Sequence, residues 1–179
     1  MAKFETLPTI PIHPNHIQLQ PPSLPELVHL NDPAKYVMTD FTQTPPHIIS
    51  LEKTMDEALR EMKVTKAHFL LVQNHAGYFQ GIIGSEDVFG EKPIQIIQAR
   101  RIPRNQISVG MVMTPCFEIM GLDMSTVEAA SVGHIVKTLA DNKTQYVLVI
   151  SKARNSSANT IRGIFSASQI EKQLHQEIK

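Results

Sequence analysis

Residues 81–88 read GIIGSEDV, and residues 163–170 read GIFSASQI. Each stretch begins with a glycine and an apolar run, then continues into small or polar residues that suit the start of a helix. A strand, a tight turn and a helix start form an arrangement in which backbone N–H groups can receive a phosphate. The same residues can simply cap a helix, so both a ligand site and a structural role are open at this point.

The chain repeats itself from residue 36 onward. Three elements return 75 to 77 residues later, and a fourth returns 82 residues later. The last offset is larger because the polar loop after residue 150 is longer than the loop after residue 72, and lengthening a surface loop costs little stability. The matched segments are 37–39 with 112–114, 54–62 with 131–139, 69–72 with 146–150, and 81–88 with 163–170.

The second matched segment is predicted to be an amphipathic helix in both copies. Thr54 and Ser131 suit the N-cap position, and Thr54 with Glu57 has the spacing of a capping box. Apolar residues then fall on one helical face, at positions 55, 58, 59 and 62 and at 132, 135, 136 and 139. The predicted unit is strand, helix, two-stranded hairpin and helix. Because neither copy could build a large core alone, we expect an α+β fold in which the two copies pack face to face.

This pattern resembles the cystathionine β-synthase (CBS) domain, and two copies in one chain resemble the tandem pair called a Bateman module. The resemblance is carried by Val-Met-Thr at 37–39 with GIIGSEDV, and by Val-Met-Thr-Pro at 112–115 with GIFSASQI. It covers nearly everything except the N-terminal segment, and it is closest to small bacterial proteins that consist of little but this pair. The expected boundaries are an arm at 1–35, repeat 1 at 36–90, a connector at 91–108 and repeat 2 at 109–175.

The resemblance implies a regulatory sensor and not an enzyme. CBS pairs commonly bind adenosine-containing ligands (AMP, ADP, ATP or S-adenosylmethionine) in the clefts between repeats, and no cofactor is required. In the family motif an Asp binds the ribose hydroxyls, and a Ser or Thr three residues earlier helps to hold phosphate. Family members typically form flat homodimers, so the resemblance implies a homodimer. Its output would pass either through a protein partner, not identifiable from the sequence, or through the oligomer.

Each copy of the motif keeps half of these residues. Repeat 1 has the acid, Asp87, but Gly84 stands at the hydroxyl position, which leaves Ser85 as an imperfectly placed substitute. Repeat 2 has the hydroxyl, Ser166, but Gln169 stands at the acid position. A carboxylate accepts from both hydroxyls of a cis-diol better than a neutral amide does. The sequence therefore favours repeat 1 as the nucleotide site.

Four further positions are expected to line the clefts. Thr39 and Thr114 lie where the entry segments of the family line them, and Ile48 and Ile49 would flank a base in repeat 1. The alternative is that Asp87 and Ser166 only cap helices, a role worth about 0.5 to 2 kcal/mol each. On that alternative the protein is a ligand-free dimerisation or scaffold protein whose nucleotide sites have decayed.

The N-terminal segment differs in composition from the rest. Seven of the twelve prolines lie within the first 33 residues, which disfavours helix and central strand. The segment is also rich in Leu and Ile, unlike a typical disordered tail. We expect an extended arm that lies against the folded body or a partner subunit, with an unbound linker as the alternative.

Charge and composition argue against several other functions. Lys plus Arg and Asp plus Glu both total 17 in a chain of 179 residues, so nucleic-acid and membrane-surface binding are not expected. There is no apolar run long enough to span a membrane and no secretory signal, and Cys116 is the only cysteine, which suits the cytoplasm. The eight histidines lack metal-ligand spacing, and no nucleophile–base set is evident. The arginines at 100, 101 and 104 could contact a polyphosphate or be solvated.

Overall fold

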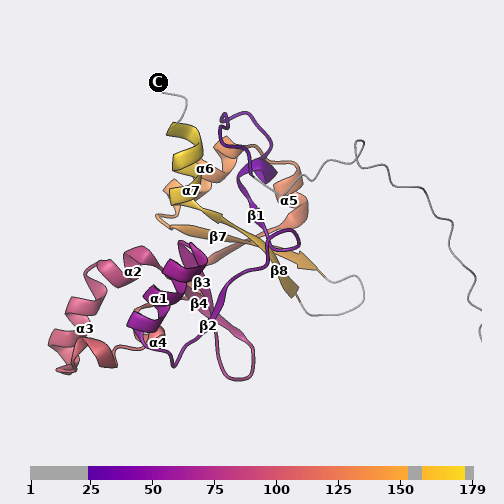
Figure 1. Ribbon diagram of the computed structural model, residues 1–179. Coiled ribbons are helices and arrows are strands. Elements are labelled where there is room, and N and C mark those ends of the chain that lie inside the picture. The colour runs from indigo at the N-terminus through magenta and orange to yellow at the C-terminus, as the bar shows by residue number, and fades with distance from the viewer. Residues whose placement is uncertain (1–23, 153–158, 176–179) are drawn as a thin grey trace, which may run out of the picture.

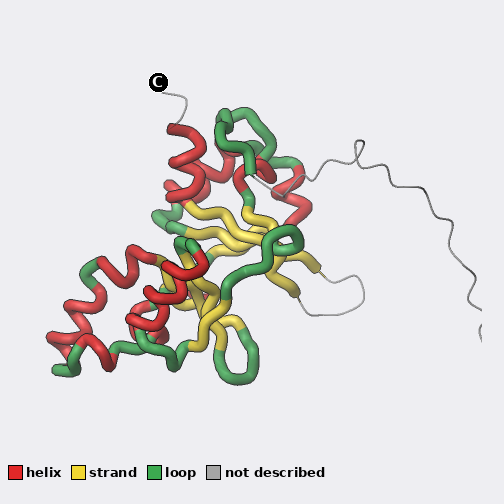
Figure 2. The backbone as a smooth tube through the Cα atoms, viewed as in Figure 1, coloured by secondary structure: helices red, strands yellow, loops and turns green. Residues whose placement is uncertain are grey.

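Two sheets lie together at the centre of the molecule and helices cover their outer faces (Figures 1 and 2). The computed structural model describes residues 24–152 and 159–175, so the part of the predicted arm at 1–23 lies outside the described residues. The strand orders are β2-β3-β4-β5 and β1-β8-β7-β6. The α+β class and the face-to-face packing of two repeats are confirmed.

The first sheet consists of β2 (Ile48–Ser50), β3 (Phe69–Gln73), β4 (Phe79–Gly84) and β5 (Thr114–Pro115). The helices of this half are α1 (Met55–Thr65), α2 (Ser85–Phe89), α3 (Lys92–Arg100) and α4 (Val109–Val112), with the 3-10 turn η3 (Arg104–Gln106) before α4. The predicted connector at 91–108 contains α3 and η3. Gly90 separates α2 from α3, whereas the corresponding helix of the second half is continuous.

The second sheet consists of β1 (Thr39–Asp40), β8 (Asn159–Ser166), β7 (Tyr146–Lys152) and β6 (Met120–Asp123). Its helices are α5 (Met124–Glu128), α6 (Val132–Asp141) and α7 (Ala167–His175), and the 3-10 turns η2 (Ala34–Val37) and η4 (Cys116–Glu118) complete the described elements. In Figure 1 the first half lies below and to the left, and the second half lies above it.

Helix α1 begins as its sequence predicts. The backbone N–H of Glu57 donates to the Thr54 hydroxyl at 3.2 Å, and the Glu57 carboxylate accepts from the backbone N–H of Thr54 at 2.8 Å. This reciprocal pair satisfies two N–H groups that the first turn leaves unbonded. The apolar face of the helix is buried at Met55, Ala58 and Met62, as expected from its spacing.

The strands alternate between two environments, because successive side chains of a strand point to opposite faces of its sheet. Leu70, Val72 and Ile83 pack under the helices of the first half. Leu71 and Ile82 point the other way, into a separate cluster between the two sheets, which they share with residues 146, 148 and 164. This inner cluster is the surface on which the repeats meet.

The entry segment of each repeat lies on the other repeat. Strand β1 pairs antiparallel with β8, with Thr39 opposite Ile164, and β5 pairs antiparallel with β4, with Thr114 opposite Ile82. In Figure 1 the indigo β1 lies among the orange and yellow strands of repeat 2. The Val-Met-Thr motifs follow the same exchange, because Val37 is buried in the core of repeat 2 and residue 112 in the core of repeat 1.

Two matched glycines allow this exchange. A Cβ atom on Gly81 would lie 2.3 Å from the carbonyl oxygen of Thr114, and one on Gly163 would lie 2.5 Å from that of Thr39. These are the glycines that open the two motif stretches. They are required because a backbone crosses directly above each of them.

A bidentate ion pair stabilises the crossing of β1 over β8. The Arg162 guanidinium on β8 donates from Nε and Nη2 to the two carboxylate oxygens of Asp40 on β1, both at 2.9 Å. Asp40 also accepts from the backbone N–H and the hydroxyl of Thr42. The hydrogen bond from Arg162 is the main reason that the pKa of Asp40 falls from 3.8 to about 2.

The described end of the N-terminal segment packs on repeat 2. Val28 is fully buried in the core of repeat 2. The Gln173 side-chain amide donates to the carbonyl oxygen of Pro25 at 2.5 Å, and the backbone N–H of Gly133 donates to that of Leu30 at 2.8 Å. Residues on the N-terminal side of β1 therefore also pack on repeat 2, as β1 itself does.

We predict that Gly81→Ala and Gly163→Ala each lower the free energy of unfolding by about 1 to 3 kcal/mol, because the new methyl group meets a backbone carbonyl. Gly121→Ala on β6 is the control, since the atom nearest its methyl group would be a side-chain carbon of Ile150, at 3.2 Å, and the backbone oxygen of Leu148 would lie at an ordinary contact distance of 4.0 Å. Urea unfolding measures all three variants. An equal free energy of unfolding in all three variants would contradict the claim that a backbone segment crosses directly above Gly81 and Gly163.

We predict that Asp40→Asn destabilises the protein at pH 7 by about 1 to 2 kcal/mol, because a partly buried bidentate pair is lost. The folded pKa of Asp40, about 2, lies below its ordinary 3.8, so its contribution is complete above pH 4 and is lost as the pH falls toward 2. The stability difference between wild type and variant should therefore shrink over that range. A difference independent of pH would show that the pair contributes nothing.

Candidate functional site

The structure forms two matched clefts between the repeats. Cleft A has a volume of about 270 Å3 and is lined by Thr39, Phe41, Thr44, Pro45, Pro46, His47, Thr65, Lys66, Ala67, His68, Phe69, Ser166, Ser168 and Gln169. Cleft B has a volume of about 240 Å3 and is lined by Glu86, Asp87, Thr114, Glu118, Asn142, Lys143, Thr144, Gln145 and Tyr146.

The two clefts have the same construction. Each combines the entry segment and the β-hairpin start of one repeat with the closing helix of the other repeat. Lys66 in cleft A corresponds to Lys143 in cleft B, and both adopt the left-handed conformation, with φ of 56° and 50°. Because of the strand exchange, the acid or amide of one repeat faces the entry threonine of the other.

The predicted site residues are regrouped accordingly. Thr39 of repeat 1 lies with Ser166 and Gln169 of repeat 2 in cleft A, and Thr114 of repeat 2 lies with Asp87 of repeat 1 in cleft B. Thr39 and Asp87, both of repeat 1, therefore line different clefts. The pairing of strands, which a short entry segment does not reveal, decides which half-motif meets which threonine.

The two predicted base-flanking residues lie elsewhere. Ile48 and Ile49 line a separate surface groove with residues of α1. Ile49 points into the core of repeat 1, and the side chain of Ile48 is half exposed. The structure therefore does not bring them together with Asp87.

Cleft A is apolar with a polar rim. The Thr39 hydroxyl donates to Oε1 of Gln169 at 3.2 Å, and the hydroxyls of Ser166 and Ser168 lie 3.0 Å apart. Phe41 and Phe69 supply apolar walls. This combination of apolar surface with a few directed polar groups is typical of a small-molecule site, although its volume is near the lower end of the usual range.

Nitrogen bases and ammonium groups gather at cleft A. His47, Lys66 and His68 line it, and Nζ of Lys172 lies 3.3 Å from Nε2 of His68. No Asp or Glu is among its described lining residues. Such a setting favours an anionic group over a cationic one.

In cleft B the predicted ribose-binding acid already has partners. Asp87 is buried, and its two carboxylate oxygens accept from the backbone N–H of Gly84 at 2.9 Å and from Nζ of Lys92 at 2.8 Å. The same ammonium group donates to the carbonyl oxygen of Val112 at 3.2 Å. Asp87 thus starts helix α2 and holds the next helix, α3, against the entry segment of repeat 2.

Tyr146 accounts for the glycine at the hydroxyl position. A Cβ atom on Gly84 would lie 2.2 Å from the Tyr146 hydroxyl oxygen, so that phenol occupies the space of a side chain there. The hydroxyl donates to Oε1 of Glu86 at 2.7 Å. Burial, and then the nearby Glu86, raise the pKa of Tyr146, which therefore stays a neutral donor. Ser85, the expected substitute, donates to the neighbouring Glu86 at 3.2 Å.

Tyr146 and Lys92 were missed by motif comparison. A signal exists in the alignment of the repeats, where Phe69 and Tyr146 correspond while Ser166 and Gly84 correspond. At these two matched positions each cleft therefore has one hydroxyl group, which comes from Ser166 in cleft A and from the Tyr146 phenol in cleft B. The two rings lie in an edge arrangement with centroids 5.6 Å apart.

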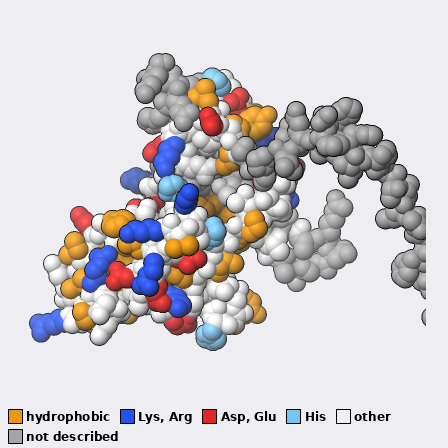
Figure 3. All heavy atoms as spheres, viewed as in Figure 1, with side chains coloured by type: hydrophobic (Ala, Val, Ile, Leu, Met, Phe, Trp, Pro, Cys, Tyr) orange, Lys and Arg blue, Asp and Glu red, His pale blue; other side chains and the backbone are white. Residues whose placement is uncertain are grey.

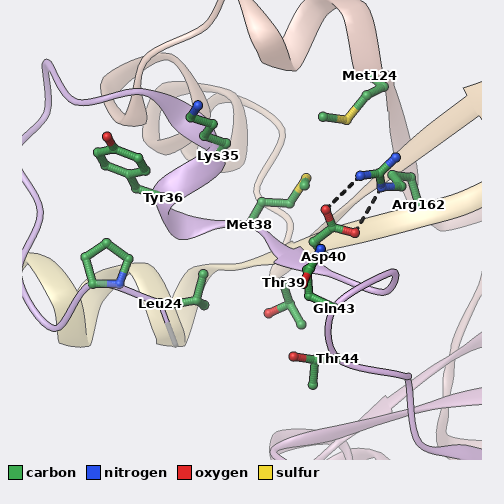
Figure 4. Close-up of a pocket in the computed structure, with 11 residues that line it drawn as sticks. Leu24, Lys35, Tyr36, Met38, Thr39, Asp40, Gln43, Thr44, Met124 and Arg162 are labelled. Carbon is green, nitrogen blue, oxygen red and sulfur yellow. Dashed lines mark hydrogen bonds and ion pairs between the residues drawn. The ribbon is translucent and has the colours of Figure 1, made fainter. Parts of the chain in front are cut away.

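A further cavity of about 510 Å3 borders β1 (Figure 4). Leu24, Tyr36 and Met38 form its apolar walls, where the described part of the N-terminal segment begins. The charges of Asp40 and Arg162 at its edge neutralise each other, as the dashed lines in Figure 4 show. Nine of its eleven lining residues belong to 24–44, and repeat 2 contributes Met124 and Arg162.

Other candidate chemistry finds little support in the described residues. They contain no group of three or more His, Cys, Asp or Glu side chains that could hold a metal ion. Within the same residues, no helix is long and apolar enough for a bilayer span. Positive and negative side chains are intermixed on the face in Figure 3. Arg104 lies 3.7 Å from an oxygen of Asp56 and lines neither cleft.

The fold agrees with comparisons to known proteins. The family model for the CBS domain matches residues 37–92. The chain contains a CBS domain. Its two repeats together have the fold of a tandem CBS pair, as the solved structures that it resembles also indicate. None of the curated proteins matches the sequence.

Three solved structures illustrate the likeness. An uncharacterized conserved protein from Pyrococcus horikoshii has a TM-score of 0.56 at 19% identity, over 85% of this chain and 96% of that chain. CBSX2 in complex with AMP has a TM-score of 0.52 at 15% identity, over 83% and 98%. A CBS domain protein of unknown function from Thermoplasma acidophilum has a TM-score of 0.53 at 14% identity, over 76% and 70%. At these identities the likeness shows the fold alone.

Proposed function

We propose that this protein is a non-catalytic sensor that binds an adenine nucleotide in cleft A. The observation that carries the proposal is the combination, between two CBS-type repeats, of an apolar cleft with hydroxyl groups and a cationic rim. A structural neighbour, CBSX2, was solved with AMP. The apolar walls suit a purine base, and the serine hydroxyls at the start of α7 suit a phosphate.

The charge of the cleft selects among the adenosine-containing ligands. Lys66, His68 and Lys172 offer donors to phosphate oxygens, and a phosphate gains charge-assisted hydrogen bonds from such groups. S-Adenosylmethionine carries a sulfonium cation, which these groups would repel. AMP, ADP and ATP are therefore preferred over S-adenosylmethionine.

Gln169 sets the expected strength of binding. Its amide can accept from one ribose hydroxyl but lacks the charge of the Asp in the family motif, so a hydrogen bond to it is weaker. Its Oε1 must also exchange the Thr39 hydroxyl for the ligand. Binding should therefore be weak for this site, in the micromolar to millimolar range.

The output of binding would be a change in how the repeats pack. Cleft A contains residues of both repeats, so a ligand that fits one arrangement better shifts the equilibrium by its difference in affinity. The signal would pass to a protein partner or through a homodimer, within the cytoplasm. The competing proposal, a ligand-free scaffold, is favoured by the existing partners of Asp87 and by the amide at Gln169.

We predict that millimolar AMP or ATP raises the melting temperature and that S-adenosylmethionine does so less, because only ligands that bind the folded state stabilise it. Isothermal titration calorimetry then gives the affinity. Absence of any shift with all three nucleotides and with S-adenosylmethionine would support the scaffold.

We predict that Gln169→Asp tightens AMP binding about five- to tenfold, since a carboxylate accepts from both ribose hydroxyls. Asp87→Asn in cleft B is the matched control and should leave the AMP affinity unchanged. The opposite ranking of the two variants would move the site to cleft B.

A further inference from the structure

Repeat 1 has Gly84, Glu86 and Asp87 at the motif positions of cleft B, where repeat 2 has Ser166, Ser168 and Gln169 in cleft A. We propose that cleft B is a latch between the repeats, in which Lys92 engages Asp87 and Tyr146 engages Glu86, and that the protein binds one nucleotide per chain. The stoichiometry rests on the proposed function of cleft A. The latch itself rests on contacts within the chain.

The first half of the latch is the ion pair of Lys92 with Asp87. The ammonium group takes one carboxylate oxygen, and the backbone of Gly84 takes the other. A ribose could bind here only after Lys92 is displaced from a carboxylate whose side chain is 7% exposed. That displacement would leave a buried charge without its counter-ion, which is strongly unfavourable.

The second half is the hydrogen bond from Tyr146 to Glu86. It joins β7 of repeat 2 to α2 of repeat 1, and the Tyr146 side chain is almost fully buried. Its hydroxyl fills the space above Gly84 that the motif serine would otherwise use. Any larger residue at position 84 would be incompatible with this contact, so the glycine and the tyrosine depend on each other.

Charge reinforces the difference between the clefts. Glu86 stands where cleft A has Ser168, and Glu118 lines the same cleft from the entry segment of repeat 2. The exposed Lys143 lines cleft B as well, and Lys92 is engaged by Asp87. A phosphate entering cleft B would meet the carboxylate of Glu86 instead of a serine hydroxyl, and like charges at that distance repel.

The stoichiometry is tested by titration calorimetry with AMP on the full chain. Wild type should bind one AMP per chain. Ser168→Trp, which fills cleft A from an exposed position at the start of α7, should abolish binding, whereas Gln145→Trp, an exposed position of cleft B, should leave it unchanged. Two AMP per chain, with one lost in each variant, would overturn the latch while leaving the proposed function intact.

The latch can also be opened. The double variant Glu86→Ser, Lys92→Met removes the repelling carboxylate and frees Asp87, so we expect the stoichiometry to rise from one to two. A stoichiometry that stays at one in a folded double variant would count against the assignment of these two residues.

Thermal unfolding without ligand tests the latch even if wild type binds no nucleotide. Tyr146→Phe should lower the melting temperature by about 2 to 4 °C, as the loss of one buried polar contact does in a chain of this size. Lys92→Met should lower it by more, because the buried Asp87 carboxylate loses its counter-ion. Lys137→Met, which breaks an exposed pair with Asp141 on α6, is the control and should change it by less than about 1 °C. Unchanged melting in the first two variants would overturn the latch by itself.

Discussion

The crossing of the entry strands over two glycines is the constraint on which the rest of the structure depends. Each crossing brings a carbonyl oxygen so close to the sheet that a Cβ would clash, at Gly81 below Thr114 and at Gly163 below Thr39. Because the segments before the crossings are buried in the opposite repeat, each core is completed by the other half of the chain. Two repeats too small to be stable alone thereby become one folding unit.

The same crossing creates the clefts and makes them differ. It places the entry segment of one repeat beside the closing helix of the other, so each cleft is lined by both repeats. A few residue differences between the repeats then give the two clefts different roles. Where cleft A has Phe69, Ser166 and Gln169, cleft B has Tyr146, Gly84 and Asp87, together with the ammonium group of Lys92. An apolar cleft with a cationic rim and a latched acidic cleft follow from a single internal duplication.

Much of the fold could be predicted from the sequence because its signals are local. The capping box at Thr54 and the amphipathic face of α1 depend on neighbours within a turn or two. The exchange of β1 and β5 could not be predicted, since a two-residue strand carries no information about its partner sheet. The site depended on that exchange, so the sequence offered Thr39, Thr114, Asp87 and Ser166 as candidates but could not assign them to the two clefts. Lys92 was hidden because its contact with Asp87 needs the bend at Gly90.

Native-state hydrogen exchange of a Val37→Ala variant tests the central claim, that each repeat is completed by the other, most directly. Val37 belongs to the entry segment of repeat 1 in the sequence but is buried in the core of repeat 2. Interlocked repeats unfold together, so the variant should lower the protection of the β4 and β8 amides by the same free energy. Loss of protection in β4 alone would place Val37 in its own repeat, and loss in β8 alone would show that the repeats unfold independently. Either result would contradict the interlocked fold.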